Sequence, residues 1–342
     1  MKRWTGWVLG ILGAALWLFS LASPVSAEKV IYCASWSIYG QHAPIVAALQ
    51  RGTFKAHGLD VTHLRGYGSG DTFKRIGTGA CNYGDAGAGP SAIGRTKGIK
   101  AKQIAMVMAK FQETLYFFAD SGIKTPKDIE GRRITGGPKA SSDILMWPVL
   151  AKAQGIDTSK VQILYMTSGA KAASLGKGQV DVVIDFHSQL PRYLNLANQS
   201  GKKLVVQLWE DFGIDLYANG LIASDETIAK RKDLTRRFLR GYFEAQRWAF
   251  RNRKASVDLF LKKYPEQNRA GALQAQDLFF FHFFDKFTDK FGLGYMDREK
   301  MANSINLTLQ ARGIKTKLDP SELYTNEFVN GLPKELRFFH KM

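Results

Sequence analysis

Residues 69–82 read SGDTFKRIGTGACN and residues 168–181 read SGAKAASLGKGQVD, so one pattern of Ser-Gly, Gly-x-Gly and Asn or Asp recurs 99 positions later. In each copy we predict that Ser-Gly ends a strand and opens a short helix, and that Gly-x-Gly turns into the next strand. Two copies predict two similar α/β lobes, each presenting free backbone N–H groups at the carboxyl ends of its strands. We therefore expect a cleft between the lobes.

Around both copies, short apolar and β-branched runs alternate with helical patterns. The predicted strands are 30–36, 59–64, 81–86, 133–135, 161–165 and 180–185, and the predicted helices are 45–51, 71–76, 141–154 and 171–175. This alternation predicts mostly parallel, doubly wound α/β sheets that are covered by helices.

Two extended segments are predicted to carry the chain between the lobes, Glu113 to Asp120 and Leu216 to Ala223. Lobe one would then comprise residues 28–115 and 220–342, and lobe two residues 116–219. Beyond the second crossing we expect helices that pack through two apolar stripes. These stripes are Phe238, Tyr242, Ala245 and Ala249, and then Phe280, Phe283, Phe284 and Phe287.

The N-terminus has the pattern of an export signal. Lys2 and Arg3 precede an apolar run that ends at Ala22, and small residues lead to Ala27. A charged start, a short apolar run and a small-residue end are typical of a signal peptide, here residues 1–27. We expect cleavage after Ala27 and a mature periplasmic protein that begins at Glu28, with an uncleaved membrane anchor as the alternative.

The 342 residues carry a net charge of +18, but the basic residues are scattered, with their densest cluster on the predicted helix around residues 230–240. We interpret them as a solvated surface and expect no nucleic-acid partner, because export also argues against one. The two cysteines, Cys33 and Cys81, are expected to be buried thiols, with a disulfide as the alternative. The six histidines are dispersed, so neither a metal site nor a cofactor is expected.

Several short motifs share their order and spacing with one family. They are the strand ending in Trp36, Gly52-x-Phe54, His57-Gly58-Leu59-Asp60-Val61, Gly79-x-x-Asn82-Tyr83-Gly84, Ile129-x-Gly131-Arg132-Arg133-Ile134 and Gly178-Gln179-Val180-Asp181. From about residue 30 to 249 the chain resembles the nitrate, sulfonate, taurine and thiamine-pyrimidine group of ABC solute-binding proteins. The resemblance implies the type II periplasmic-binding-protein fold, with two doubly wound α/β lobes joined by a two-segment hinge. It also implies a monomer that carries a small organic ligand to an ABC permease and its ATPase.

The same resemblance places the ligand-facing residues in the loops that follow the strands. They are Trp36, Tyr39, Gln41, His42, Ser69, Asp71, Gly89, Ser91, Gly137, Lys139, Ser141, Ser142, Asp185 and His187. Asn82 departs from the Asp that the family often has, and the turn before Ser141 is not tied to one ligand.

The residues themselves point to an anion. Lys139 lies in a glycine-containing turn that enters a helix, where free N–H groups and the helix dipole favour negative charge, and Ser141 can cap that helix. Trp36 at the end of the first strand is expected to form an apolar wall opposite Lys139. Together they predict an aromatic carboxylate or an organic sulfonate, and a thiamine-pyrimidine-like heterocycle is the alternative.

An enzyme and a sensory or adhesive module are the two alternative classes of function. An enzyme on the same fold could use His42 or His187 with Asp71 or Asp185 as an acid-base pair. We expect no catalytic residues, because the cysteine-rich motif of the pyrimidine-forming relatives is absent and an exported chain lacks cytoplasmic substrates. An extracytoplasmic sensory or adhesive module is the third possibility, and nothing in the sequence adds a signalling domain to it.

Overall fold

The computed structural model describes residues 27–341, and its strands form two five-stranded sheets. In the first sheet the order is β2-β1-β3-β10-β4, and in the second it is β7-β6-β8-β5-β9. The strands of the first sheet are β1 (Glu28–Cys33), β2 (Leu59–Leu64), β3 (Tyr83–Gly87), β4 (Ala101–Met106) and β10 (Asn219–Ser224). Those of the second are β5 (Glu113–Phe118), β6 (Arg133–Gly136), β7 (Gln162–Tyr165), β8 (Val182–Phe186) and β9 (Leu204–Leu208).

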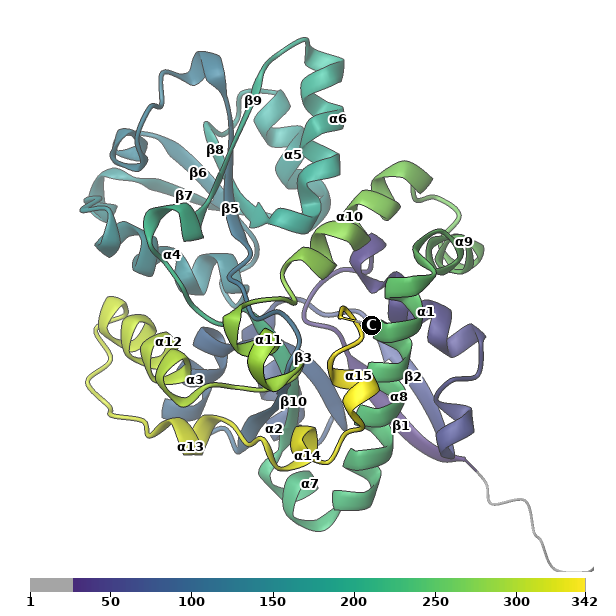
Figure 1. The fold of residues 1–342 in the computed structure, drawn as a ribbon. Helices are drawn as coiled ribbons and strands as arrows, with labels where there is room; N and C mark the ends of the chain where they lie inside the picture. The colour runs from purple at the N-terminus through teal and green to yellow at the C-terminus, as the bar shows by residue number, and fades with distance from the viewer. Residues whose placement is uncertain (1–26, 342) are drawn as a thin grey trace, which may run out of the picture.

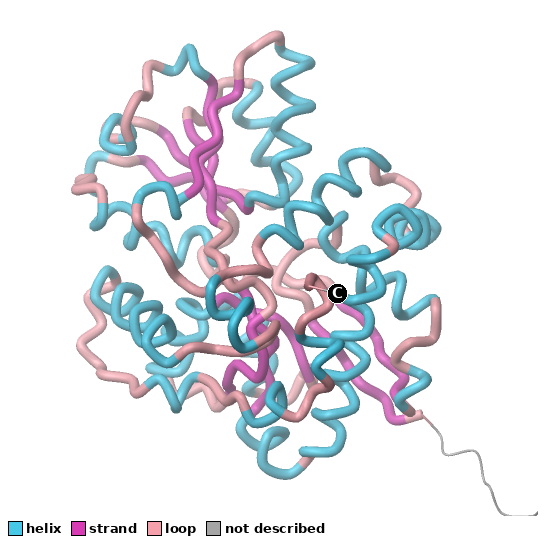
Figure 2. Tube along the Cα trace, viewed as in Figure 1, coloured by secondary structure: helices cyan, strands magenta, loops and turns pink. Residues whose placement is uncertain are grey.

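The two sheets repeat one arrangement. In each, three strands run parallel and the strand beside them, β10 or β5, is antiparallel to its neighbours. Helices cover both sheets, and Figures 1 and 2 show each sheet at the centre of its own lobe. The expected pair of doubly wound α/β lobes is therefore confirmed.

Helices alternate with the strands and then fill the last third of the chain. Those of the alternating part are α1 (Ala43–Gln50), α2 (Ser69–Gly77), α3 (Ala88–Thr96), α4 (Ser142–Ala153), α5 (Ser168–Gly176) and α6 (Leu190–Ser200). The later ones are α7 (Asp225–Lys230), α8 (Lys232–Arg251), α9 (Arg253–Lys263), α10 (Arg269–Phe281), α11 (Lys286–Phe291), α12 (Arg298–Ala311), α13 (Pro320–Leu323), α14 (Glu327–Asn330) and α15 (Lys334–Arg337). None of the helices within residues 27–341 is long and apolar enough to span a membrane.

The sequence repeat is also a structural repeat. Helices α2 and α5 and strands β3 and β8 occupy positions related by the same offset of 99. The last residue of the motif makes the same hydrogen bond in both copies. The Asn82 side chain accepts from the backbone N–H of Ile31 at 2.7 Å, and the Asp181 side chain accepts from the backbone N–H of Arg133 at 2.8 Å. Asn and Asp both supply an oxygen that accepts this bond from the neighbouring strand. Asn82 can therefore take the structural role that Asp has in the second copy.

The chain crosses between the sheets earlier than we expected. Residues 113–118 form β5 inside the second sheet, so the first crossing lies in residues 107–112. The second crossing lies in residues 213–218, because β10 begins at Asn219. The error arose because a buried strand and an extended connection have the same apolar pattern. The lobe boundaries remain a proposal.

Of the two expected apolar stripes, one lies on a single helix and the other does not. Phe238, Tyr242, Ala245 and Ala249 are all buried on one face of α8, as expected. The phenylalanine stripe instead spans two helices, since α10 ends at Phe281 and the Asp285 carboxylate caps the start of α11. An N-cap aspartate is a start signal, and it outweighs the continuing apolar period here.

The expectation of two separate thiols is wrong, because Cys33 and Cys81 form a disulfide with their Cα atoms 6.1 Å apart. Cys33 ends β1 and pairs with Gly84 in β3, while Cys81 lies just before β3. The pairing of β1 with β3 thus brings together two residues that are 48 positions apart in the sequence. Spacing alone could not show this register.

Candidate functional site

Trp36 follows β1 in the first lobe and lies against the second lobe. Its side chain is buried, and its ring meets that of Phe186 edge-on at 5.9 Å. A Cβ atom on Gly137 would come within 2.5 Å of the Trp36 ring, so the turn after β6 is packed directly against the indole. Trp36 is therefore an apolar wall between the lobes, and its Nε1 is buried without a partner among the described residues.

The loop after β1 also forms hydrogen bonds across the cleft. The Tyr39 hydroxyl lies 2.7 Å from the Ser188 hydroxyl, which in turn donates to the Gln41 side-chain oxygen at 2.9 Å. All three side chains are buried. Ser188 was not predicted from the sequence, although it follows His187 directly in the same loop.

On the other side of Trp36 the two lobes meet backbone to backbone. The N–H of Gly70 donates to the carbonyl of Ala140 at 3.0 Å. Gly68 has a φ of +131°, and a Cβ there would lie 2.7 Å from the same carbonyl oxygen. Only glycine allows both this conformation and this approach, so the loop before Ser69 is shaped to touch the second lobe.

The predicted anion site is occupied by the protein's own carboxylate. Asp143 accepts hydrogen bonds from the N–H of Gly137 at 2.8 Å and from the Ser141 hydroxyl. The Ser141 side chain makes no capping bond to the helix, which corrects the expected cap. The N–H and hydroxyl groups that we assigned to a ligand are therefore already satisfied.

Lys171, and not Lys139, supplies the ammonium beside Trp36. Lys139 is exposed, and its ammonium lies 5.4 Å from the centre of the Tyr165 ring. The ammonium beside Trp36 belongs to Lys171, 5.2 Å from the indole centre and fully buried. Lys171 was not expected here, because nothing in the sequence distinguishes it from the solvent-exposed lysines of other predicted helices.

Lys171 holds two buried carboxylates. Its Nζ lies 2.6 Å from Asp143 and 3.3 Å from Asp185, and Tyr193 donates to Asp185 at 2.7 Å. Burial lowers the pKa of Lys171, but the two carboxylates outweigh burial and leave the pKa raised. This buried cluster holds two carboxylates against one ammonium, so negative charge is in excess.

Glu113 adds a further carboxyl group to this region. It is buried, it accepts a hydrogen bond from the Ser142 hydroxyl at 2.5 Å, and its Oε2 has no partner among the described residues. Burial raises its pKa to about 7, against the opposing bond from Ser142 and with help from the charge of Asp143. Glu113 can therefore donate or accept a proton near neutral pH.

A small polar cavity of about 20 Å³ lies beside the crossing segments in the first lobe. Gln41 and His42 line it, as do Asp85 and Asn219. Burial lowers the pKa of His42 to about 4, although the Asp85 charge opposes this. The volume fits about one water molecule among several polar groups.

The remaining predicted residues all lie on α2 and α3 of the first lobe. Ser91 is buried and accepts from Gln103 at 3.0 Å, and the Ser69 hydroxyl accepts from the N–H of Gly87 at 3.1 Å, so both stabilise the first lobe. Gly89 lies against Met146 of the second lobe, since a Cβ on it would lie 2.3 Å from the sulfur. Asp71 is half-buried in the first turn of α2.

No predicted acid-base pair is joined by a hydrogen bond within residues 27–341. His42 contacts the backbone of Tyr39, and His187 lies 3.1 Å from the ring nitrogen of His282. Asp185 is bound by Lys171 and Tyr193 instead. Within the same residues, no group of three or more His, Cys, Asp or Glu side chains could hold a metal ion.

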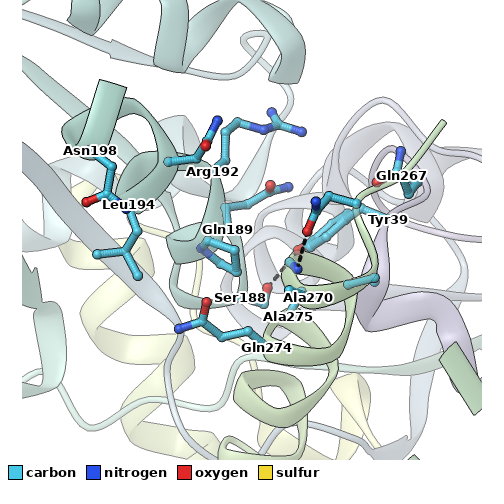
Figure 3. Close-up of a pocket in the computed structure, with 16 residues that line it drawn as sticks. Tyr39, Ser188, Gln189, Arg192, Leu194, Asn198, Gln267, Ala270, Gln274 and Ala275 are labelled. Atoms are coloured by element: carbon cyan, nitrogen blue, oxygen red, sulfur yellow. Dashed lines mark hydrogen bonds between the residues drawn. The ribbon is translucent and has the colours of Figure 1, made fainter. Parts of the chain in front are cut away.

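A larger groove of about 460 Å³ opens beside Tyr39 and Ser188, between α6 of one lobe and α10 of the other (Figure 3). Arg192 and Gln189 lie on the α6 side, while Gln267 and Gln274 face them from the α10 side (Figure 3). This surface was not expected, because the predicted ligand-facing loop ends at His187. The available signal was the set of polar side chains Ser188, Gln189 and Arg192 that follows His187.

The chain is similar in sequence to known binding proteins. A family model described as NMT1/THI5 like matches residues 39–256. The riboflavin-binding protein RibY of Chloroflexus aurantiacus is 26% identical over 302 residues, covering 85% of this chain and 83% of that protein.

Solved structures show the same architecture. A protein of Bordetella bronchiseptica RB50 superposes with a TM-score of 0.69 at 20% identity, covering 88% of this chain and 95% of that one. The alkanesulfonate-binding protein SsuA from Xanthomonas axonopodis pv. citri, bound to MOPS, gives a TM-score of 0.66 at 17% identity and covers 88% and 99%. At these identities the likeness establishes the periplasmic-binding-protein fold.

Proposed function

The chain belongs to the NMT1/THI5-like family, and we propose that it is the exported solute-binding component of an ABC importer. It binds one small organic molecule between its lobes and delivers it to a membrane permease that is driven by an ATPase. Family membership and a fold shared with ABC-type binding proteins support this proposal. The signal-like N-terminus supports export to the periplasm, but the predicted cleavage point falls at the edge of the described residues.

The observation that carries the proposal is the contact between the loops after β1 and β8. Tyr39 and Gln41 of one lobe share the Ser188 hydroxyl of the other, and Trp36 faces Phe186 beside them. These contacts break when the lobes separate and re-form when they close. A ligand that touches both loops would stabilise the closed state by its differential affinity for it.

The charges of the cleft favour a flat uncharged heterocycle as the ligand. Asp143 and Asp185 both lie against the ammonium of Lys171, and Glu113 lies near Asp143, so a sulfonate or carboxylate would bring further negative charge into a buried acidic site. Burying an anion without a counter-charge is costly. A ring with N–H groups or neutral nitrogens can instead contact the Trp36 face and hydrogen-bond to Glu113.

The named relatives divide between the two ligand classes. RibY is named for riboflavin, which contains such a ring, and SsuA is named for alkanesulfonates. The alternative expected from the sequence was a thiamine-pyrimidine-like heterocycle, and the ligand proposed here is its wider class, a flat uncharged ring. An aromatic carboxylate or organic sulfonate is the second candidate. Lys139 is exposed, so it is not proposed as the counter-charge for such an anion.

The test is a screen of mature protein by titration calorimetry. The panel contains riboflavin, lumiflavin, adenine, cytosine, an aminopyrimidine, benzoate and MOPS. A ring compound that binds at one site, with no chemical change to the compound afterwards, supports the proposal. Tight binding of MOPS or benzoate alone would favour the anion, and conversion of any compound would favour an enzyme on the same fold.

A further inference from the structure

The groove between α6 and α10 has a distinctive composition. Six of its lining side chains are carboxamides, one is a guanidinium, and no carboxylate lines it. The carboxamides are Gln189, Asn195, Asn198, Gln267, Asn268 and Gln274, and the guanidinium is Arg192. A volume of about 460 Å³ lies within the usual size of small-molecule sites, about 300–1,000 Å³.

Two of these groups are held in place. Gln189 is only 3% exposed, and its Nε2 is buried without a hydrogen-bond partner among the described residues. Arg192 donates through one nitrogen to the carbonyl of Ser168 at 2.5 Å and to its hydroxyl at 3.2 Å. No carboxylate within residues 27–341 forms a salt bridge with Arg192, so its other N–H groups are available. The groove is thus lined both by a side chain with an unpaired donor and by an anchored guanidinium with N–H groups to spare, which are features of a polar binding site.

We propose that this groove is a subsite for a hydroxylated, uncharged part of the ligand, such as a polyol chain or a sugar. The proposal rests on the function proposed above and extends it from the ring to its substituent. Carboxamides offer one acceptor and two donors, which match hydroxyl groups that both donate and accept. Arg192 adds donors for hydroxyl oxygens, while the absence of carboxylates leaves a cationic substituent unpaired.

The groove adjoins the contact between the lobes. Tyr39 and Ser188 line the groove and also form the hydrogen bond that joins the lobes. Trp36 lies three residues before Tyr39, and Phe186 two residues before Ser188. A ligand whose ring contacts Trp36 can therefore place a substituent between α6 and α10, where it contacts both lobes and favours closure.

Three matched pairs of probes test the subsite: riboflavin with lumiflavin, adenosine with adenine, and cytidine with cytosine. In each pair the ring is shared and only the first compound carries a hydroxylated substituent. For at least one pair we expect the hydroxylated member to bind about tenfold or more tightly, as two or more added hydrogen bonds would produce. Equal affinities within every pair that binds would overturn the subsite and leave the proposed function standing.

Variants of exposed residues locate the effect. Asn195→Ala combined with Asn198→Ala removes two groove carboxamides from exposed positions of α6. It should remove most of the gain from the hydroxylated substituent and leave the affinity for the bare ring unchanged. Gln199→Ala, on the same helix but outside the groove lining, is the matched control. An equal loss for the ring and its hydroxylated partner, or an equal loss in the control, would overturn the assignment. If no ring compound binds, the proposed ligand class fails, and the subsite with it.

Discussion

The ammonium of Lys171 lies 5.2 Å from the centre of the Trp36 ring, so the cation beside the indole of one lobe comes from helix α5 of the other. Both side chains are buried. Lys171 is also bound to Asp143 and Asp185, which prevents it from acting as a free counter-charge for an anion. This one relationship changes the expected ligand from an anion to an uncharged ring.

Replacing Lys171 should destabilise the second lobe severely. Lys171→Met leaves Asp143 and Asp185 buried together without a cation, and breaking a buried pair typically costs about 3–5 kcal/mol. Urea unfolding measures the loss. Lys177→Met, at the exposed end of the same helix, is the control and should lie within about 0.5 kcal/mol of the parent. A stable Lys171→Met protein would mean that the cluster is not charged as described.

Trp36 should report the ligand directly. In Trp36→Phe we expect the ligand-induced change in tryptophan fluorescence to fall and the affinity for the ring compound to drop about fivefold, as the loss of about 1 kcal/mol of stacking implies. Trp248→Phe removes a tryptophan on α8, outside the cleft, and should leave both unchanged. Circular dichroism checks that both variants fold. An undiminished response in Trp36→Phe would remove the indole from the site.

The hydrogen bond between Tyr39 and Ser188 should matter for closure more than for folding. Tyr39→Phe and Ser188→Ala each remove it, and each should weaken ligand binding several-fold while unfolding free energies change by about 1 kcal/mol or less. If the bond is the shared cause, the double variant will lose little more than either single one. Additive losses would show that the two residues act separately.

Stability should depend on pH through Glu113. Its pKa in the folded chain, about 7, lies above the ordinary value of 4.5, so the folded state holds this proton more tightly than the unfolded state. The folded state is therefore favoured at low pH, and this stabilisation is lost as pH rises from 4.5 towards 7, by an amount on the order of 3 kcal/mol.

Glu113→Gln keeps the hydrogen-bonding shape without the charge. Between pH 5 and pH 8 we expect the unfolding free energy of this variant to fall less than that of the parent. The surface change Glu335→Gln should leave the parental pH dependence intact. Parallel pH profiles for the parent and Glu113→Gln would show that Glu113 stays charged when buried.

The sequence was sufficient for the architecture because the architecture repeats. Ser69 and Ser168 both open short helices, and Asn82 and Asp181 both tie a turn to a neighbouring strand. Those features depend on neighbours in the chain, which the sequence shows. The strand expected to end at Trp36 ends at Cys33, and the loop that follows it brings Trp36 against Phe186 and Gly137.

The rest depended on contacts between distant segments. Cys33 and Cys81 pair through a strand register that their spacing does not reveal. Lys139 and Lys171 are equivalent as charges in a sequence, and only the packing of α5 against Trp36 shows which of them enters the cleft. Gln189 and Arg192 line a groove only because α10, which lies far along the chain, forms its other side.

A reversible lock between the lobes tests the central claim most directly. A Cβ atom on Gly70 would lie 3.6 Å from the Cβ of Ala140, within the range of about 3.5–4.5 Å that a disulfide needs. The double variant Gly70→Cys and Ala140→Cys can be oxidised empty or with the best-binding ring compound present. Each single variant is a control.

The measurement is the amount of ring compound bound by the locked protein before and after mild reduction. We predict that protein locked empty binds none, that protein locked with ligand retains it through dialysis, and that reduction restores exchange in both. Protein locked empty that binds with parental affinity and rate would contradict the claim that the ligand site lies between the two lobes.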